Sequence, residues 1–181
     1  MITNVIIGIT VVVSVLALRN NYLFQRCLFN PYVIDKNREW HRFFTHAVVH
    51  ADYMHLFFNM FVLWSFGKIV EQYYFPQLFP GFKSMLYFSL LYIGGVVLSS
   101  YPSFEKHKEH SFYNSVGASG AVSAVVFSGI LINPMQGIYF FFVPFEIPGF
   151  IFAFAYLGYS WYMSKRGNDN TVSYTHLRAH E

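Results

Sequence analysis

The sequence predicts an all-α polytopic membrane helix bundle with about five complete transmembrane helices. Apolar residue types make up 55% of its 181 residues and charged types only 12%, whereas a soluble domain carries roughly 25% charged residues. With 22 Phe and 14 Tyr, the chain has too little polar surface to cover a water-soluble core. The composition therefore argues against a disordered chain, a soluble enzyme and a nucleic-acid-binding protein.

Five apolar segments account for the predicted helices. A span needs about 18 to 20 apolar residues, and backbone groups in lipid must bond within their own segment. In chain order the segments are 1–18, 53–70, 84–104, about 117–132 and 147–164. The first lacks the basic start and cleavage pattern of a signal peptide. The longest polar connection, about 20–45, is rich in aromatic residues and predicts a structured interfacial loop.

Polar side chains within the second segment are candidates for function, because polar groups are costly in lipid. His55 and Asn59 are four residues apart, so they share one face of a helix. Two N–H donors directed at one point suit a developing oxyanion. The alternative is that both residues only form hydrogen bonds to neighbouring helices.

Three histidines, His46, His50 and His55, also raise the question of a metal site. The first two have the four-residue spacing of a zinc-binding helix. The Glu of a His-Glu-x-x-His motif is absent, and no cysteine lies nearby. We therefore expect structural hydrogen bonds from His46 and His50, and neither a metal nor another cofactor. The single cysteine, Cys27, excludes an intrachain disulfide.

The fourth segment begins with Gly-Ala-Ser-Gly at residues 117–120. Small neighbours leave the Ser119 hydroxyl accessible, and N–H groups at a helix start can face an anion. Gly120, Ala124 and Ser128 follow at four-residue spacing, which allows another helix to approach closely. A small-residue packing seam would explain the pattern equally well.

Taken together, these motifs resemble the rhomboid family of intramembrane serine proteases. The resemblance covers about residues 1–170 and implies a compact bundle of six transmembrane helices, with a large partly embedded loop at 20–50. The residues that carry it are Trp40, Arg42, His46, His50, His55, Asn59, Glu71 (preceded by Gly67), Gly117, Ser119 and Gly120.

The resemblance also implies a role for each motif residue. Ser119 matches the nucleophile, and His55 and Asn59 match the oxyanion donors, assisted by the backbone N–H of Ser119. The family takes its base from a histidine on the sixth helix. The positions expected to hold the bundle and its loop together are Trp40, Arg42 and Glu71.

The sequence departs from the family after Asn170. Residues 171–181 include Arg178 and Glu181 and are too short to cross a bilayer, so the sixth helix is expected to be missing or incomplete. Our hypothesis is a membrane domain at 1–170 and a non-matching tail at 171–181 that is foreign or disordered. His176 is the candidate base, and His180 is a second candidate with only one residue after it.

Two functions remain open from the sequence. The first is an endopeptidase that uses a Ser119–His176 dyad to cleave single-span membrane proteins in a cell (plasma or inner) membrane. The second is an inactive rhomboid-like protein, truncated or a pseudoprotease, that binds transmembrane helices. A histidine-lined transporter is disfavoured because the spans carry no paired carboxylates. The expected partners are transmembrane substrates and the lipid bilayer, not nucleic acid.

Overall fold

The computed structural model describes residues 1–138 and 146–165, and these ranges are mostly helical. Short strands β1 (Gly137–Ile138) and β2 (Ile147–Pro148) pair antiparallel between the last two helices. In chain order the helical elements are α1 (Ile2–Arg19), α2 (Asn21–Cys27), α3 (Pro31–Asn37), α4 (Arg42–Thr45), the 3-10 turn η1 (His46–Val48), α5 (Tyr53–Ile69), the π-helical segment η2 (Val70–Tyr74), α6 (Phe75–Leu78), α7 (Phe82–His107), α8 (Ser119–Ile132) and α9 (Gly149–Lys165).

Each of the five predicted apolar segments contains a helix, in α1, α5, α7, α8 and α9. Two of them, α1 and α7, are long and apolar enough to cross a membrane, and α8 and α9 include shorter apolar helices. The number of complete spans therefore stays a prediction. The fourth helix begins at Ser119 rather than at Gly117, because Gly117 has a positive φ of 108° that a regular helix does not accept.

The predicted interfacial loop is structured, because four short helical elements, α2, α3, α4 and η1, lie within residues 21–48. Two asparagines start its longer helices, as expected for N-cap residues. The Asn20 side chain accepts a hydrogen bond from the Leu23 N–H, and the Asn30 side chain accepts one from the Val33 N–H. Asp52 starts α5 in the same way, by accepting from the His55 N–H at 2.7 Å.

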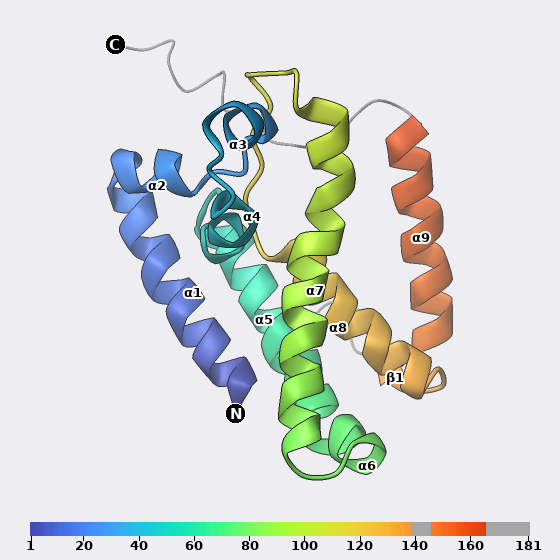
Figure 1. Ribbon diagram of the computed structural model, residues 1–181. Helices are drawn as coiled ribbons and strands as arrows, with labels where there is room; N and C mark the ends of the chain where they lie inside the picture. Colours follow the sequence, from blue (N-terminus) through green and yellow to red (C-terminus); the bar gives the residue numbers. More distant parts are fainter. Residues whose placement is uncertain (139–145, 166–181) are drawn as a thin grey trace.

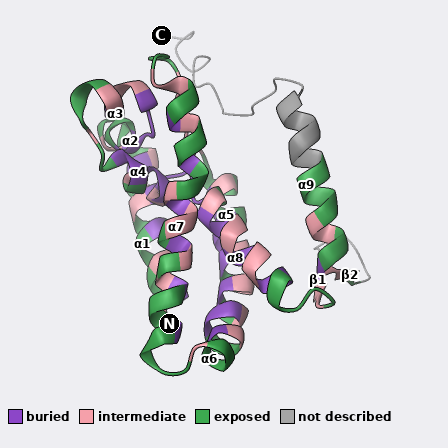
Figure 2. Ribbon diagram, turned by 45° about the vertical axis from the view of Figure 1, so that its right-hand side comes forward, coloured by how far each residue is buried: buried purple, intermediate pink, exposed green. Residues whose placement is uncertain are grey.

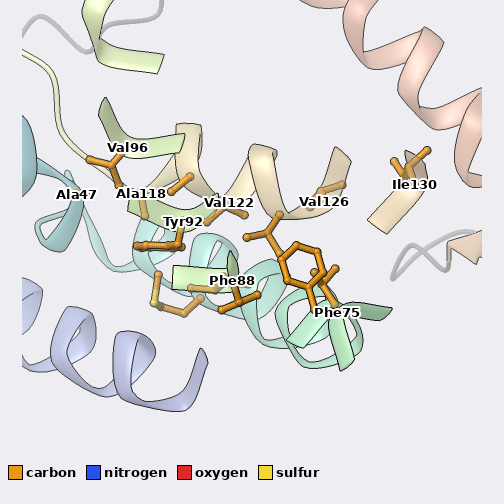
Figure 3. Close-up of a cluster of buried hydrophobic side chains, with 14 of the residues drawn as sticks. Ala47, Phe75, Phe88, Tyr92, Val96, Ala118, Val122, Val126 and Ile130 are labelled. Carbon is orange, nitrogen blue, oxygen red and sulfur yellow. The ribbon is translucent and has the colours of Figure 1, made fainter. Parts of the chain in front are cut away.

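The core lies where α5, α7 and α8 meet. Figure 3 shows the buried cluster that runs from Ala47 and Ala118 at one end to Ile130 at the other. The most extensive helix–helix contact is between α7 and α8, where Gly95 leaves room for the Ala121 backbone. A Cβ at Gly120 would overlap the Ser99 side chain, which agrees with the expected small-residue seam. Figure 2 shows exposed outer faces, and most residues in the described first part of α9, up to Gly158, are exposed.

Glu71 joins η2 to the start of α1. Its carboxylate accepts hydrogen bonds from the Ile2 N–H at 2.6 Å, the Thr3 N–H at 2.9 Å and the Thr3 hydroxyl at 2.6 Å. The first N–H groups of a helix lack partners within it, and its N-terminus attracts negative charge. A buried carboxylate from a distant part of the chain thus caps the first helix.

Candidate active site

Ser119 is the first residue of α8, and it is exposed. Within the described ranges its hydroxyl makes no hydrogen bond. Two hydrogen bonds fix the backbone just before Ser119. The Gly117 N–H donates to the His46 carbonyl at 2.9 Å, and the Ala118 N–H donates to His50 Nε2 at 3.4 Å. The free backbone donors at the head of α8 therefore begin at Ser119.

The His55 ring lies against the backbone two residues before Ser119. A Cβ added to Gly117 would stand 2.7 Å from His55 Cε1 and 3.0 Å from Nε2, so only glycine permits this approach. The positive φ at Gly117 imposes the same requirement. The structure thus brings His55 together with the segment that leads into Ser119.

Asn59 lies one turn after His55 on α5 and is buried. Its side-chain Nδ2 donates to the His55 carbonyl at 3.0 Å. An amide NH2 carries two donors, and among the described residues the second has no partner. Among the described residues, neither the His55 ring nor this N–H makes a side-chain hydrogen bond, and the His55 ring packs edge-on against His50 with ring centroids 5.0 Å apart.

His50 links three elements in the interior. The Ser14 hydroxyl of α1 donates to the Val48 carbonyl at 2.9 Å, so its oxygen accepts from His50 Nδ1 at 3.0 Å. The other ring nitrogen, Nε2, is then the acceptor for the Ala118 N–H. This arrangement needs a neutral ring, and burial lowers the pKa of His50 to about 4, with the neighbouring His55 acting in the same direction.

His46 is also buried and hydrogen-bonded. Its Nδ1 donates to the Arg42 carbonyl at 2.9 Å, and its Nε2 lies 3.1 Å from the Ser100 hydroxyl of α7. Burial lowers its pKa. Both His46 and His50 therefore form hydrogen bonds to neighbouring elements. In the described part of the chain, no group of three His, Cys, Asp or Glu residues could hold a metal ion.

A small cavity of about 130 Å³ lies beside the head of α8, between it and α7. Sequence analysis did not find it, because its α7 hydroxyls belong to a segment interpreted only as an apolar span. These hydroxyls form a group only because α7 packs against the loop. Its polar lining residues are His46, Ser99, Ser100, Ser103, Ser115 and Ser119.

The remaining motif residues lie in the loop that covers this region. The Arg42 guanidinium is buried and donates to the carbonyls of Gln25 and Leu28 and to the Glu39 carboxylate, at 2.7–2.9 Å. Hydrogen bonding to Arg42 lowers the pKa of Glu39. Trp40 is half exposed and packs on Phe104 of α7, with ring centroids 5.7 Å apart.

The sequence matches the family model described as the Rhomboid domain over residues 37–179. The chain belongs to the rhomboid family. It is accordingly an integral membrane protein from a family whose members are in general serine proteases. Among curated proteins, none matches the chain. The candidate bases of this rhomboid, His176 and His180, lie outside the described residues.

Proposed function

We propose that this rhomboid is an intramembrane serine endopeptidase that cleaves single-span membrane proteins. The observation that carries the proposal is the contact between His55 and Gly117, at the head of the helix on which Ser119 is exposed. That contact supports the proposal because the His55 imidazole lies against the backbone two residues before Ser119, whose hydroxyl makes no hydrogen bond among the described residues. The protein would be a multi-pass component of a plasma or inner membrane.

In the proposed reaction, Ser119 Oγ attacks the carbonyl carbon of the scissile peptide bond. Its proton passes to a general base, for which His176 is the candidate. The negative charge that develops on the carbonyl oxygen is bound by His55, Asn59 and the Ser119 N–H. The C–N bond then breaks, the amine leaves with the proton from the base, and water hydrolyses the acyl-enzyme.

The geometry also favours an extended substrate. A peptide bond within a helix is shielded by its neighbours, so the substrate helix must unwind before Ser119 can reach the carbonyl carbon. Exposure of Ser119 and a polar cavity beside it suit an unwound segment that enters from the lipid. Helix-breaking residues near the cut are expected in substrates.

Labelling with a fluorophosphonate tests the nucleophile. An activated serine oxygen displaces fluoride and forms a bond to phosphorus. We expect wild type and Ser123→Ala to be labelled and Ser119→Ala to be unlabelled. Ser123 is the matched control because it lies one turn further along α8. Equal labelling of wild type and Ser119→Ala would refute the proposal and support the non-catalytic, helix-binding alternative.

Three further variants test the assigned donors and base. We expect His55→Ala and Asn59→Ala each to lower the cleavage rate by about 10²- to 10³-fold. His110→Ala, at an exposed loop histidine, is the control for loss of an imidazole. His176→Ala should abolish labelling if His176 is the base, and unchanged labelling would exclude that residue.

A further inference from the structure

An open apolar groove of about 340 Å³ lies between α1 and α5, and none of the residues assigned to catalysis lines it. The two helices pack side by side in opposite directions, because a Cβ at Gly67, near the end of α5, would meet Thr3 at the start of α1. Val11 of α1 forms one wall, and the buried Leu56 and Met60 of α5 form the floor.

The other wall of the groove is a stripe of aromatic side chains on α5. Phe57, Phe61 and Trp64 are spaced by four and three residues, so they share one helical face. Neighbouring ring centroids in this stripe are 6.1 Å and 6.5 Å apart. Phe57 and Trp64 are each about half exposed. In a membrane protein this surface is therefore open to lipid.

The aromatic stripe ends at a lysine. Lys68 follows Trp64 by four residues on the same face of α5. Its Nζ lies 5.9 Å from the centroid of the Trp64 ring, which is within the range of a cation–π contact. The ammonium group therefore stands at one end of the groove, at the end of α5 that is farther from the interfacial loop.

Lys68 has no ion-pair partner among the described residues. The helix that faces it, α1, carries no charged side chain before Arg19 at its far end. The nearest acidic residue along the chain is Glu71, and its buried carboxylate accepts hydrogen bonds from the start of α1. The charge at the end of the groove is thus available to an anion, and basic residues at a membrane surface attract anionic lipids.

The length of the stripe fits one leaflet of a bilayer. Phe57 precedes Lys68 by eleven residues, which is about 16 Å along a helix axis. The hydrocarbon core of a bilayer is about 30 Å thick, so one leaflet contributes about half of this. A lipid with its headgroup at Lys68 can therefore extend an acyl chain along the stripe as far as Phe57.

We propose that this groove binds one anionic phospholipid, with an acyl chain along the aromatic stripe and the phosphate at Lys68. Lysine binds phosphate as a compact point charge. A zwitterionic lipid offers the same acyl chain, but its own cation offsets the attraction of its phosphate to Lys68. A soluble phosphate has no apolar part to fill the groove. The site goes beyond peptide cleavage and does not depend on Ser119.

Trp64 reports on contact with lipid at this site. The sequence has three tryptophans, so Trp40→Phe and Trp161→Phe leave Trp64 as the only one. Phospholipids with brominated acyl chains quench tryptophan fluorescence on contact. The full chain would be placed in bilayers that mix phosphatidylglycerol and phosphatidylcholine, with one of the two brominated. We expect phosphatidylglycerol to bind beside Trp64 about fivefold more strongly than phosphatidylcholine at low salt, as expected for one basic residue.

Variants of the two lysines test the origin of this preference. Lys68→Gln should bring the ratio of the two binding constants to about one, and Lys68→Arg should preserve it. Lys83→Gln is the matched control, because Lys83 belongs to α7 and no residue of α7 lines the groove. High salt should lower the preference, because exposed charges are screened.

Three results would overturn the proposal. The first is equal quenching by the two lipids in the Lys68 protein. The second is an undiminished preference in Lys68→Gln. The third is the absence of quenching by either lipid, which would show that another helix or a second copy of the chain covers the groove.

Unfolding in a neutral detergent separates a lipid from a free ion. Short-chain phosphatidylglycerol should raise the unfolding midpoint of wild type more than that of Lys68→Gln, because a ligand that binds the folded state stabilises it. Inorganic phosphate at the same concentration should leave both midpoints unchanged. An equal rise with inorganic phosphate would assign the site to a soluble anion and overturn the proposal.

Discussion

Replacing Glu71 should detach the start of α1 from the bundle. The carboxylate has two oxygens, with Oε1 accepting from the Ile2 N–H and Oε2 accepting from the Thr3 N–H and hydroxyl. In Glu71→Gln one oxygen becomes an NH2 group, so at least one N–H loses its acceptor at a cost of about 1–3 kcal/mol. The remaining bonds become neutral and each weakens by about 1 kcal/mol.

The expected loss is therefore about 4 kcal/mol in the free energy of unfolding, a large share of a typical total of 5–15 kcal/mol. The measurement is denaturant unfolding in mild detergent, with hydrogen exchange over the first turns of α1. Gln72→Ala is the control, because that neighbour is exposed. Thr3→Val in both backgrounds should cost less when Glu71 is already Gln. A loss below about 1 kcal/mol would refute the capping role.

Three other perturbations have clear expectations. Gly120→Val should lower the free energy of unfolding by about 2 kcal/mol or more. The control Gly94→Val, where a Cβ meets nothing within 4 Å, should lower it less. Equal unfolding midpoints for the two variants would disprove the small-residue seam. Gly117→Ala should slow fluorophosphonate labelling, whereas Gly81→Ala, at another positive φ but in open space, should not. The pKa of Glu39 is lowered in the folded protein, so its stabilisation is present above about pH 4.3 and is lost as pH falls through the folded pKa. Glu39→Gln should flatten this part of the pH–stability curve, and an unchanged curve would contradict it.

The arrangement of the loops allows a test of membrane orientation. The α7–α8 connection lies on the same side as the interfacial loop, since Phe29 and Ser115 exchange backbone hydrogen bonds. We predict that this side faces outward. Cys27 is buried, so a membrane-impermeant maleimide needs a cysteine at Phe112, which is 87% exposed. Phe112→Cys should be labelled in intact cells. Labelling only after lysis would show that this side faces the cell interior.

The helices could be predicted from the sequence because an apolar segment in lipid must bond its own backbone groups, and a helix does so within one segment. The predicted second segment, 53–70, differs by one residue from α5, whose start is fixed by the adjacent Asp52 cap. Errors arise where a local backbone angle decides the boundary. The head of α8 is such a case, since the φ of Gly117 cannot be read from its composition or spacing.

Contacts between distant segments could not be predicted in the same way. Glu71 was expected to hold the bundle together only by resemblance, and nothing in its own segment indicates that it caps a helix 68 residues earlier. The hydroxyls of Ser99, Ser100 and Ser103 are similar, because a serine within an apolar run normally bonds to its own helix backbone. The cavity that they share with His46 exists only after packing.

The position of Ser119 depends more on the loop than on its own helix. The last two N–H groups before it bond to His46 and His50, and both residues precede α5. Arg42 in turn holds the same loop through the carbonyls that end α2. In contrast, the described contacts of α9 with α8 lie further along, from Ser123 to Ile130. Changes in the loop should therefore disturb the nucleophile, whereas changes in α9 should mainly alter access to it.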